Sequence, residues 1–404
     1  MLARVETALL TGLALRCLWV ALVPMVLMSD PAAYDAMARN LLNHGVYGFE
    51  PDVPNATWPP GTSALYALIY ALPGPDILAT KTVNVLLSTL NIWLAWGVAR
   101  RLFGARAALF TAWAMALWPQ MIFFTTLTAS ETPFLTAVLA GTLFWDRARD
   151  GHLANAVFAG IFIALACYFR SIALLLPIAF AIGELLKGKD LLRLMVRLVI
   201  TGVIMATCIA PWSLRNTQLY GTTVVLSSNF GSNLYIGNGP GSTGRFGSTD
   251  TPDELESLDY VERSQRLGDL AKAEIRANPG AFVKRSLSKL VIIHDRETVG
   301  VAWNQMALRP LIGTTGEAVL KGLATLYWWV ILGAALIGLI WQIIRGIGLT
   351  ILWSIPMAAW GYFASIHAII LAGDRFHMPQ APFVAMLGAS ALAGWLARRD
   401  QLRS

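Results

Sequence analysis

The sequence has little charge. Charged residues make up only 14% of its 404 residues, whereas 56% are hydrophobic. A soluble domain carries about a quarter of its residues as charged side chains, so this composition excludes a soluble globular protein. Several apolar runs reach the roughly 20 residues that cross a bilayer as a helix. The sequence therefore predicts an all-α polytopic membrane protein with about ten transmembrane helices.

Cysteine is also scarce, and metal-ligand spacing is missing. Cysteines in apolar runs behave as small core residues, so we expect neither disulfides nor a cysteine metal site. The three cysteines all lie in such runs: Cys17, Cys167 and Cys208. Four of the five histidines show no spacing typical of metal ligands: His44, His152, His294 and His367.

The formal net charge of +7 does not indicate a nucleic-acid partner. No soluble module combines basic residues with stacking aromatics, and short basic loops instead set the orientation of membrane helices. With the N-terminus in the cytoplasm, the first loop, residues 213–318 and residues 373–377 face outward. The basic residues that then fall inside are Arg100, Arg101, Arg106, Arg147, Arg149, Lys187, Lys189, Arg345, Arg398, Arg399 and Arg403.

Composition divides the chain into three segments. Residues 1–212 form an N-terminal membrane module with an opening loop at 29–61, residues 213–318 form a polar extracytoplasmic segment, and residues 319–404 form the closing membrane helices. The run Thr62 to Leu72 is too short to span and ends at Pro73-Gly74-Pro75, so we expect it at the interface. Arg16 lies inside the first span, where we expect it to snorkel or to pair within the bundle. The expected spans are 9–28, 77–99, 107–118, 123–145, 153–169, 172–186, 194–212, 320–344, 347–371 and 378–396.

The opening loop begins with two acids. Asp30 and Asp35 follow directly on the apolar run that ends at Met28. Carboxylates at a membrane boundary lose hydration, and such residues often serve a function. Asp30 is therefore a candidate catalytic base. Two plainer roles stay open, since an aspartate before Pro31 also suits a helix start and Asp35 also suits a solvated helix position.

The remaining ionisable residues of the predicted outer face form a mixed set. A site that binds an anionic lipid head group needs cations to hold the phosphate and a carboxylate to activate a hydroxyl. Plainer roles exist, since Glu131 suits the first turn of a helix and Arg170 suits a turn. Arg375 and His377 also suit interfacial anchors. The set comprises Glu131, Asp374, Lys81, Arg170, Arg215, Arg375 and His377.

An ordered set of motifs resembles one enzyme family. The chain carries, in order, SD..AYD.MARNLL..GVYG, WPPG, SETPF, PWSLRNTQLYG, NLYIGNGPGSTG and GDRFHMPQAP. This set is similar to polyprenyl-phosphate-sugar glycosyltransferases of the C-type membrane fold. The closest branch is bacterial glycosyltransferase family 39, akin to protein mannosyltransferases and lipid A aminoarabinose transferases. The resemblance covers nearly the whole chain, although no single motif is diagnostic.

The resemblance implies a C-type fold, interfacial helices in the first loop, and an active site on the extracytoplasmic side of a bacterial inner membrane. It implies that Asp30 is the base and that Glu131 is a second acid. One departure concerns Trp58, because the aminoarabinose branch has a lysine before its paired prolines; this leaves both the sugar and the phosphate contact open. The residues assigned to substrate are Tyr34, Asp35, Lys81, Arg170, Arg215, Arg375 and His377.

These features predict a glycosyltransferase that moves a sugar from a polyprenyl phosphate, expected to be undecaprenyl phosphate, to an extracytoplasmic acceptor by inverting displacement. Glu131 would position the acceptor, the sugar or a divalent metal, so a metal cofactor stays open. A transporter or flippase of a lipid-linked sugar is the alternative, yet alternating access needs ionisable groups near the midplane. A non-catalytic scaffold would leave Asp30 and Arg170 without a role.

Overall fold

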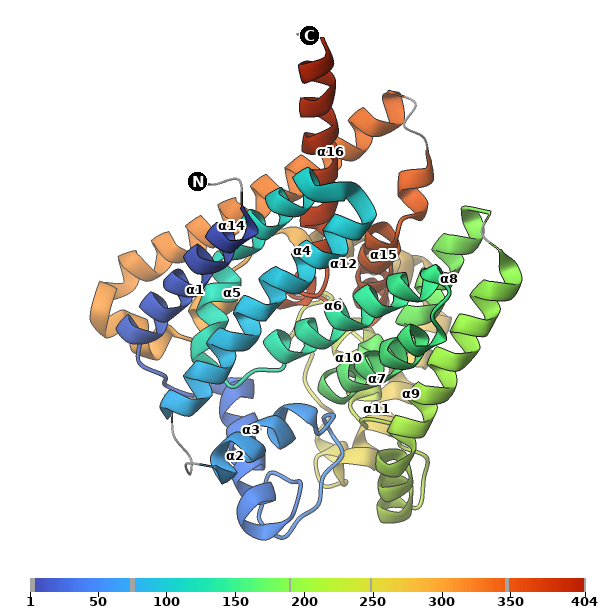
Figure 1. Ribbon diagram of the computed structural model, residues 1–404. Coiled ribbons are helices and arrows are strands. Elements are labelled where there is room, and N and C mark those ends of the chain that lie inside the picture. The colour runs from blue at the N-terminus through green and yellow to red at the C-terminus, as the bar shows by residue number, and fades with distance from the viewer. Residues whose placement is uncertain (1–3, 73–76, 189, 248, 346–348, 403–404) are drawn as a thin grey trace.

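The computed structural model describes residues 4–72, 77–188, 190–247, 249–345 and 349–402. Within these ranges the chain is helical, and its only β-type pairings are isolated bridges. The two termini lie at one end of the molecule, and α2 (Ser29–His44) and α3 (Gly61–Ala71) lie at the opposite end (Figure 1). Four predicted features fall outside the described residues: the Pro73-Gly74-Pro75 break, Lys189, the start of a span at Ile347, and Arg403.

Within the described part of the chain, five helices are long and apolar enough to cross a membrane: α1 (Val5–Leu22), α4 (Ile77–Ala116), α9 (Leu191–Tyr220), α14 (Gln305–Ile344) and α16 (Ala381–Gln401). Large apolar side chains cover their outer surfaces, as at Leu18, Val199 and Ile337, which suits contact with lipid rather than water. The predicted all-α membrane fold is confirmed, whereas the number of spans stays a prediction.

Shorter helices complete the bundle. They follow in the order α5 (Pro119–Phe123), η1 (Phe124–Thr126), α6 (Glu131–Arg147), η2 (Ala148–Asp150), α7 (Leu153–Phe169), η3 (Ser171–Ala173), α8 (Leu176–Leu186), α10 (Phe230–Asn238), η4 (Asp253–Leu255), α11 (Tyr260–Ala277), α12 (Pro279–His294), α13 (Val299–Ala302), η5 (Leu349–Trp353), α15 (Ile355–Ile369) and η6 (Asp374–His377).

Two glycines set element boundaries that differ from the predicted spans. Gly104 has φ +83° inside α4, so the expected spans 77–99 and 107–118 belong to one element with a sharp bend. Gly313, with φ +67°, bends α14 in the same way. Glycine adopts this left-handed backbone without steric cost, and an apolar pattern does not distinguish a bend from a loop. The expected segment limits at 212 and 318 fall within α9 and α14.

Arg16 is fully buried in α1 and pairs within the bundle. Its Nε donates to Ser88 Oγ at 2.7 Å, and its terminal nitrogens donate to the carbonyls of Gly12, Met115 and Ala116. The last two carbonyls end α4, where a helix leaves its final oxygens without internal partners. The guanidinium therefore joins α1 to the end of α4.

The polar segment after α9 folds back against α15. Gly237 of α10 approaches the end of α15 so closely that an added Cβ would clash with the carbonyl oxygen of Ile370. Lys289 of α12 is fully buried there, and its Nζ donates to Asn238 Oδ1 at 2.8 Å and to the carbonyls of Ile369 and Ile370. These contacts hold the last turn of α15, directly before the loop that leads to η6.

Candidate active site

A cavity of about 470 Å³ opens where the start of α2, the α7–η3 turn, α10, α13 and η6 meet. These elements come from distant parts of the chain, and the start of α2 and the α7–η3 turn belong to segments predicted to face outward. The ionisable and aromatic residues in its wall are Asp30, Tyr34, Trp58, Phe169, Arg170, Phe230, Phe246, Trp303, His367, Asp374, Arg375 and Phe376.

Asp30 lies in the first turn of α2 and faces Arg375. Arg375 Nη1 donates to Asp30 Oδ2 at 2.5 Å, and about a quarter of each side chain is exposed. No side chain caps α2, so Asp30 does not fill the helix-start role that its position before Pro31 suggested. Ser29 has φ +54°, a left-handed backbone that costs a non-glycine residue of order 1–3 kcal/mol and is found at functional sites.

Glu131 forms the second ion pair of the site. It is buried in the first turn of α6, and its Oε1 accepts from Arg170 Nη1 at 2.7 Å while lying 3.9 Å from Arg375 Nη1. Burial acts to lower the pKa of Arg375, but Asp30 and Glu131 raise it above its usual value. Arg375 therefore stays cationic, and two carboxylates and two guanidinium groups alternate along one side of the cavity.

Aromatic rings hold both arginines in place. The Arg170 guanidinium lies 5.6 Å from the centre of the Phe376 ring, and that of Arg375 lies 5.3 Å from the same ring and 4.8 Å from Trp303. Such cation–π contacts orient a guanidinium without consuming its hydrogen-bond donors. The remaining N–H groups can therefore bind an anion in the cavity.

Tyr34 and Trp58 form an aromatic wall beside Asp30. Their ring centres lie 4.7 Å apart, and Tyr34 is buried. Burial raises the pKa of Tyr34 to about 12, with the negative charge of Glu131 adding to the effect. The phenol is therefore neutral near pH 7 and can donate a hydrogen bond.

The loop that carries Arg375 is anchored on both sides. Before it, Asp374 Oδ2 accepts from the backbone N–H and the hydroxyl of Thr298 at 2.7 and 2.6 Å. After it, His377 is fully buried, with Nδ1 2.8 Å from the carbonyl of Ile293 and Nε2 3.0 Å from Glu297 Oε1. A carbonyl only accepts hydrogen bonds, so Nδ1 of His377 carries a proton. A second proton lies between Nε2 of His377 and the carboxyl group of Glu297.

Glu297 is a residue that the sequence analysis did not identify. It is fully buried and accepts from Trp118 Nε1 at 2.8 Å besides contacting His377. Burial raises the pKa of Glu297, and His377 partly offsets this. In the sequence it is one of many charged residues of the polar segment, and only its pairing with His377 distinguishes it.

Four other predicted site residues do not line the cavity. Asp35 pairs with Arg39 at 2.7 Å and accepts from Tyr70, and Lys81 donates to the carbonyls of Val20 and Val23 near the end of α1. Arg215 donates to the carbonyl of Asn55 and packs on Trp212, while His377 lies behind the loop. The structure thus brings Asp30, Tyr34, Arg170 and Arg375 together at the cavity wall, with Glu131 beneath them.

A metal ion at this cavity would need several side-chain ligands that converge on one point. Among the described residues, no group of three or more histidine, cysteine or acidic side chains is arranged to hold one. Asp30 and Glu131 each have an arginine partner instead, and a guanidinium occupies the position that a cation would take. These residues do not fit a divalent metal in this arrangement.

Comparison with known proteins supports the resemblance. Residues 57–214 match the family model described as dolichyl-phosphate-mannose-protein mannosyltransferase, and no curated protein matches the chain. The chain is similar to the apo oligosaccharyltransferase of Archaeoglobus fulgidus, with a TM-score of 0.61, 15% identity, and coverage of 99% of this chain and 51% of that one. The oligosaccharyltransferase AglB from Archaeoglobus fulgidus, in complex with an inhibitory peptide and a dolichol-phosphate, gives a TM-score of 0.58 at 16% identity, over 99% of this chain and 50% of that one.

A weaker likeness is to ArnT from Cupriavidus metallidurans bound to undecaprenyl phosphate, with a TM-score of 0.46 at 15% identity over 96% of this chain and 77% of that one. The chain spans about half the length of the archaeal protein, so that comparison establishes the fold and leaves the activity open. The predicted resemblance to family-39-like glycosyltransferases is confirmed by the match over residues 57–214, and the predicted C-type fold is confirmed by the likeness to the archaeal structures.

Proposed function

We propose that this chain is a membrane glycosyltransferase that transfers a sugar from a polyprenyl-phosphate donor to an acceptor hydroxyl or amide outside the cytoplasmic membrane. The observation that carries the proposal is the convergence of Asp30, Arg375, Arg170 and Glu131 on one cavity. Two cations can hold a phosphate, and an adjacent carboxylate can accept a proton. A transporter has no need of this arrangement at one end of the bundle.

The proposed reaction is a single displacement. The acceptor heteroatom attacks the anomeric carbon, its proton passes to Asp30, and the bond between the anomeric carbon and the phosphate oxygen breaks. The electron pair of that bond leaves with the lipid phosphate, whose growing charge is stabilised by Arg170 and Arg375. One displacement inverts the anomeric centre. No step passes through a metal ion.

Arg375 links donor binding to the base. While it pairs with Asp30, the carboxylate is occupied by a guanidinium. A donor phosphate competes for the same N–H groups and, as a phosphodiester monoanion, forms strong paired hydrogen bonds with arginine. We infer that donor binding draws Arg375 from Asp30, which leaves the carboxylate open to the acceptor. Glu131, which contacts both arginines, then keeps them in the cavity.

The charge of the cavity supports a neutral donor sugar. Asp30 and Glu131 are paired with arginines, and Asp374 accepts from Thr298. An amino sugar would place an ammonium group beside two guanidinium groups, and an ion pair between that ammonium and the released Asp30 would occupy the carboxylate that has to take the acceptor proton. The aromatic wall of Tyr34 and Trp58 instead suits the apolar face of an uncharged ring.

The test uses purified full-length protein in nanodiscs with labelled polyprenyl-phosphate sugars and membrane extract as the source of acceptor. We expect a labelled product, and we expect Asp30→Asn to lower the rate by about two to four orders of magnitude. Asparagine keeps the size of the side chain, so folding and donor binding should persist. Asp35→Asn is the matched control, because Asp35 does not line the cavity, and it should cost far less.

Two outcomes would contradict the proposal in different ways. If folded Asp30→Asn transfers sugar at a rate close to wild type, Asp30 is not the base although the enzyme class stands. If the wild-type protein moves intact donor across the bilayer without forming product, the chain is a transporter. Transfer of an amino sugar in preference to a neutral one would overturn only the assignment of the sugar.

A further inference from the structure

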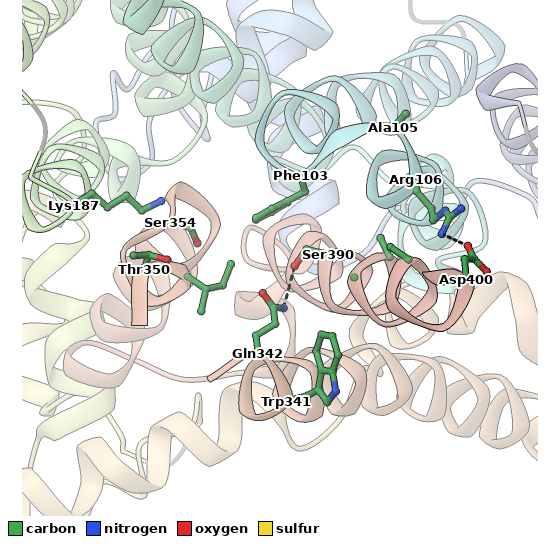
Figure 2. Close-up of a pocket in the computed structure, with 14 residues that line it drawn as sticks. Phe103, Ala105, Arg106, Lys187, Trp341, Gln342, Thr350, Ser354, Ser390 and Asp400 are labelled. Atoms are coloured by element: carbon green, nitrogen blue, oxygen red, sulfur yellow. Dashed lines mark hydrogen bonds and ion pairs between the residues drawn. The ribbon is translucent and has the colours of Figure 1, made fainter. Parts of the chain in front are cut away.

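A second cavity, of about 740 Å³, lies beside the C-terminal part of α16 (Figure 2). This part of α16 is at the end of the molecule that carries both termini (Figure 1). The wall of the cavity is formed by α4 around its bend, by the ends of α8 and α14, by η5 and by α16. The proposed transfer reaction uses none of them. Its ionisable and polar residues are Arg106, Lys187, Gln342, Thr350, Ser354, Ser390 and Asp400.

The charges of this cavity favour an anion. Arg106 and Lys187 stand on opposite sides of it (Figure 2), and the two cations outnumber the single carboxylate, Asp400. Arg106 pairs with Asp400 at 3.1 Å, but half or more of each side chain is exposed. Exposed pairs contribute at most about 1 kcal/mol, so Arg106 can exchange this partner for a phosphate at small cost. Between them, Gln342 Nε2 donates to Ser390 Oγ (Figure 2), and the Ser390 hydroxyl donates to the carbonyl of Leu387.

A third cavity, of about 610 Å³, shares one lining residue, Trp341, with the second. The third cavity lies between α4, α14 and α16, three of the helices long enough to cross a membrane. On α16 the apolar cavity is lined by residues between 385 and 395 and the cationic cavity by residues between 390 and 400, so the cationic cavity lies nearer the C-terminal end of this helix. Apolar side chains dominate the wall of the third cavity, among them Phe110, Trp113, Ile331, Leu392 and Trp395.

We propose that these two cavities bind one anionic phospholipid of the leaflet opposite the candidate active site. Its phosphate would lie between Arg106 and Lys187, and an acyl chain would follow the apolar cavity past Trp341. Basic pockets between membrane helices bind anionic head groups in this way, and tryptophan suits the boundary between head group and chain. The proposal does not depend on the glycosyltransferase assignment.

The experiment is a lipid titration of the purified full chain, followed by native mass spectrometry, with phosphatidylglycerol and phosphatidylcholine as probes. We expect phosphatidylglycerol to bind more tightly. The double variant Arg106→Gln/Lys187→Gln should lose roughly tenfold or more of that preference, because each basic residue near an anionic head group contributes about 1 kcal/mol. Ala397→Trp, which fills the cavity without changing its charge, should weaken phosphatidylglycerol binding as well.

The matched control is Arg100→Gln/Arg193→Gln, which removes two exposed cations outside this cavity. It should leave the lipid preference within about twofold, which is less than 0.5 kcal/mol. Equal effects of the two double variants, or no preference for phosphatidylglycerol in the wild type, would overturn the proposal. So would displacement of the lipid by equimolar glycerol 3-phosphate, because that result would identify a site for a soluble phosphate.

Discussion

Arg375 Nη1 lies 2.5 Å from Asp30 Oδ2, although the two residues are 345 positions apart in the chain. The contact joins the loop before the last helix to the start of the first loop. It also unites the residue expected to hold the donor phosphate with the residue expected to act as base. The two roles are therefore coupled, and a change at one residue will be felt at the other.

The first prediction concerns the phosphate contact. Arg375→Lys and Arg170→Lys keep the positive charge but lose the planar pair of donors, so each should raise the KM for donor by about tenfold, or roughly 1.4 kcal/mol. Steady-state kinetics in nanodiscs measures this. Arg276→Lys, on an exposed position of α11, is the control. Unchanged donor affinity in both Arg170→Ala and Arg375→Ala would show that neither arginine binds the phosphate.

The second prediction concerns the support behind the loop. Glu297→Ala leaves His377 and Trp118 without their shared acceptor in a fully buried position. Removing the acceptor of a buried hydrogen bond typically costs about 1–3 kcal/mol for each donor left unsatisfied, so we expect a clear fall in Tm and a raised KM for donor. Glu256→Ala, an exposed acid of the same segment, should change neither. A variant with wild-type Tm would mean that the pair contributes little to the position of Arg375.

The third prediction is a pH dependence. Burial lowers the pKa of Lys289 to about 7, whereas an unfolded lysine titrates near 10.4. Between these values the unfolded chain binds more protons, so this residue makes stability rise with pH from about 7 to 10, by at most about 1.4 kcal/mol per unit. Lys289→Met should flatten the Tm profile across that window.

The control for this effect lies on the same helix. Lys284 is exposed on α12, so Lys284→Met should leave the slope of Tm against pH unchanged. The two profiles are measured by intrinsic tryptophan fluorescence in detergent. If the Lys289→Met profile keeps the wild-type slope, the titrating group lies elsewhere.

The fourth prediction concerns orientation. The distribution of basic residues places the polar segment outside the cytoplasm, so a cysteine at Ser257 should react with an impermeant thiol reagent in intact cells. A cysteine at His152, in the loop before α7, should react only after lysis. Both are introduced in a background without native cysteines. Labelling of His152→Cys alone in intact cells would reverse the orientation and move the candidate site to the cytoplasmic face.

The sequence by itself determined the class of the molecule. Apolar runs with so little charge leave the chain no stable state but membrane helices, and the abrupt end of the first run marks Asp30 as a boundary carboxylate. Basic residues in short loops predict which ends of the helices face the cytoplasm. This assignment placed the acids and bases of the candidate set together on the predicted outer face. This one-dimensional information was enough to include Asp30, Glu131, Arg170 and Arg375 in the candidate set.

Tertiary structure decided which members of that set meet. Asp35, Lys81 and Arg215 share the same predicted level as Asp30 but contact their own neighbours instead of the cavity. Hydropathy predicts how deep a residue lies in the membrane. The direction in which its side chain points around the bundle axis depends on how helices from distant parts of the chain pack. Hydrophobic pattern does not encode that packing in a bundle whose outer and inner faces are both apolar. For the same physical reason Glu297 became visible only once its contact with His377 was known.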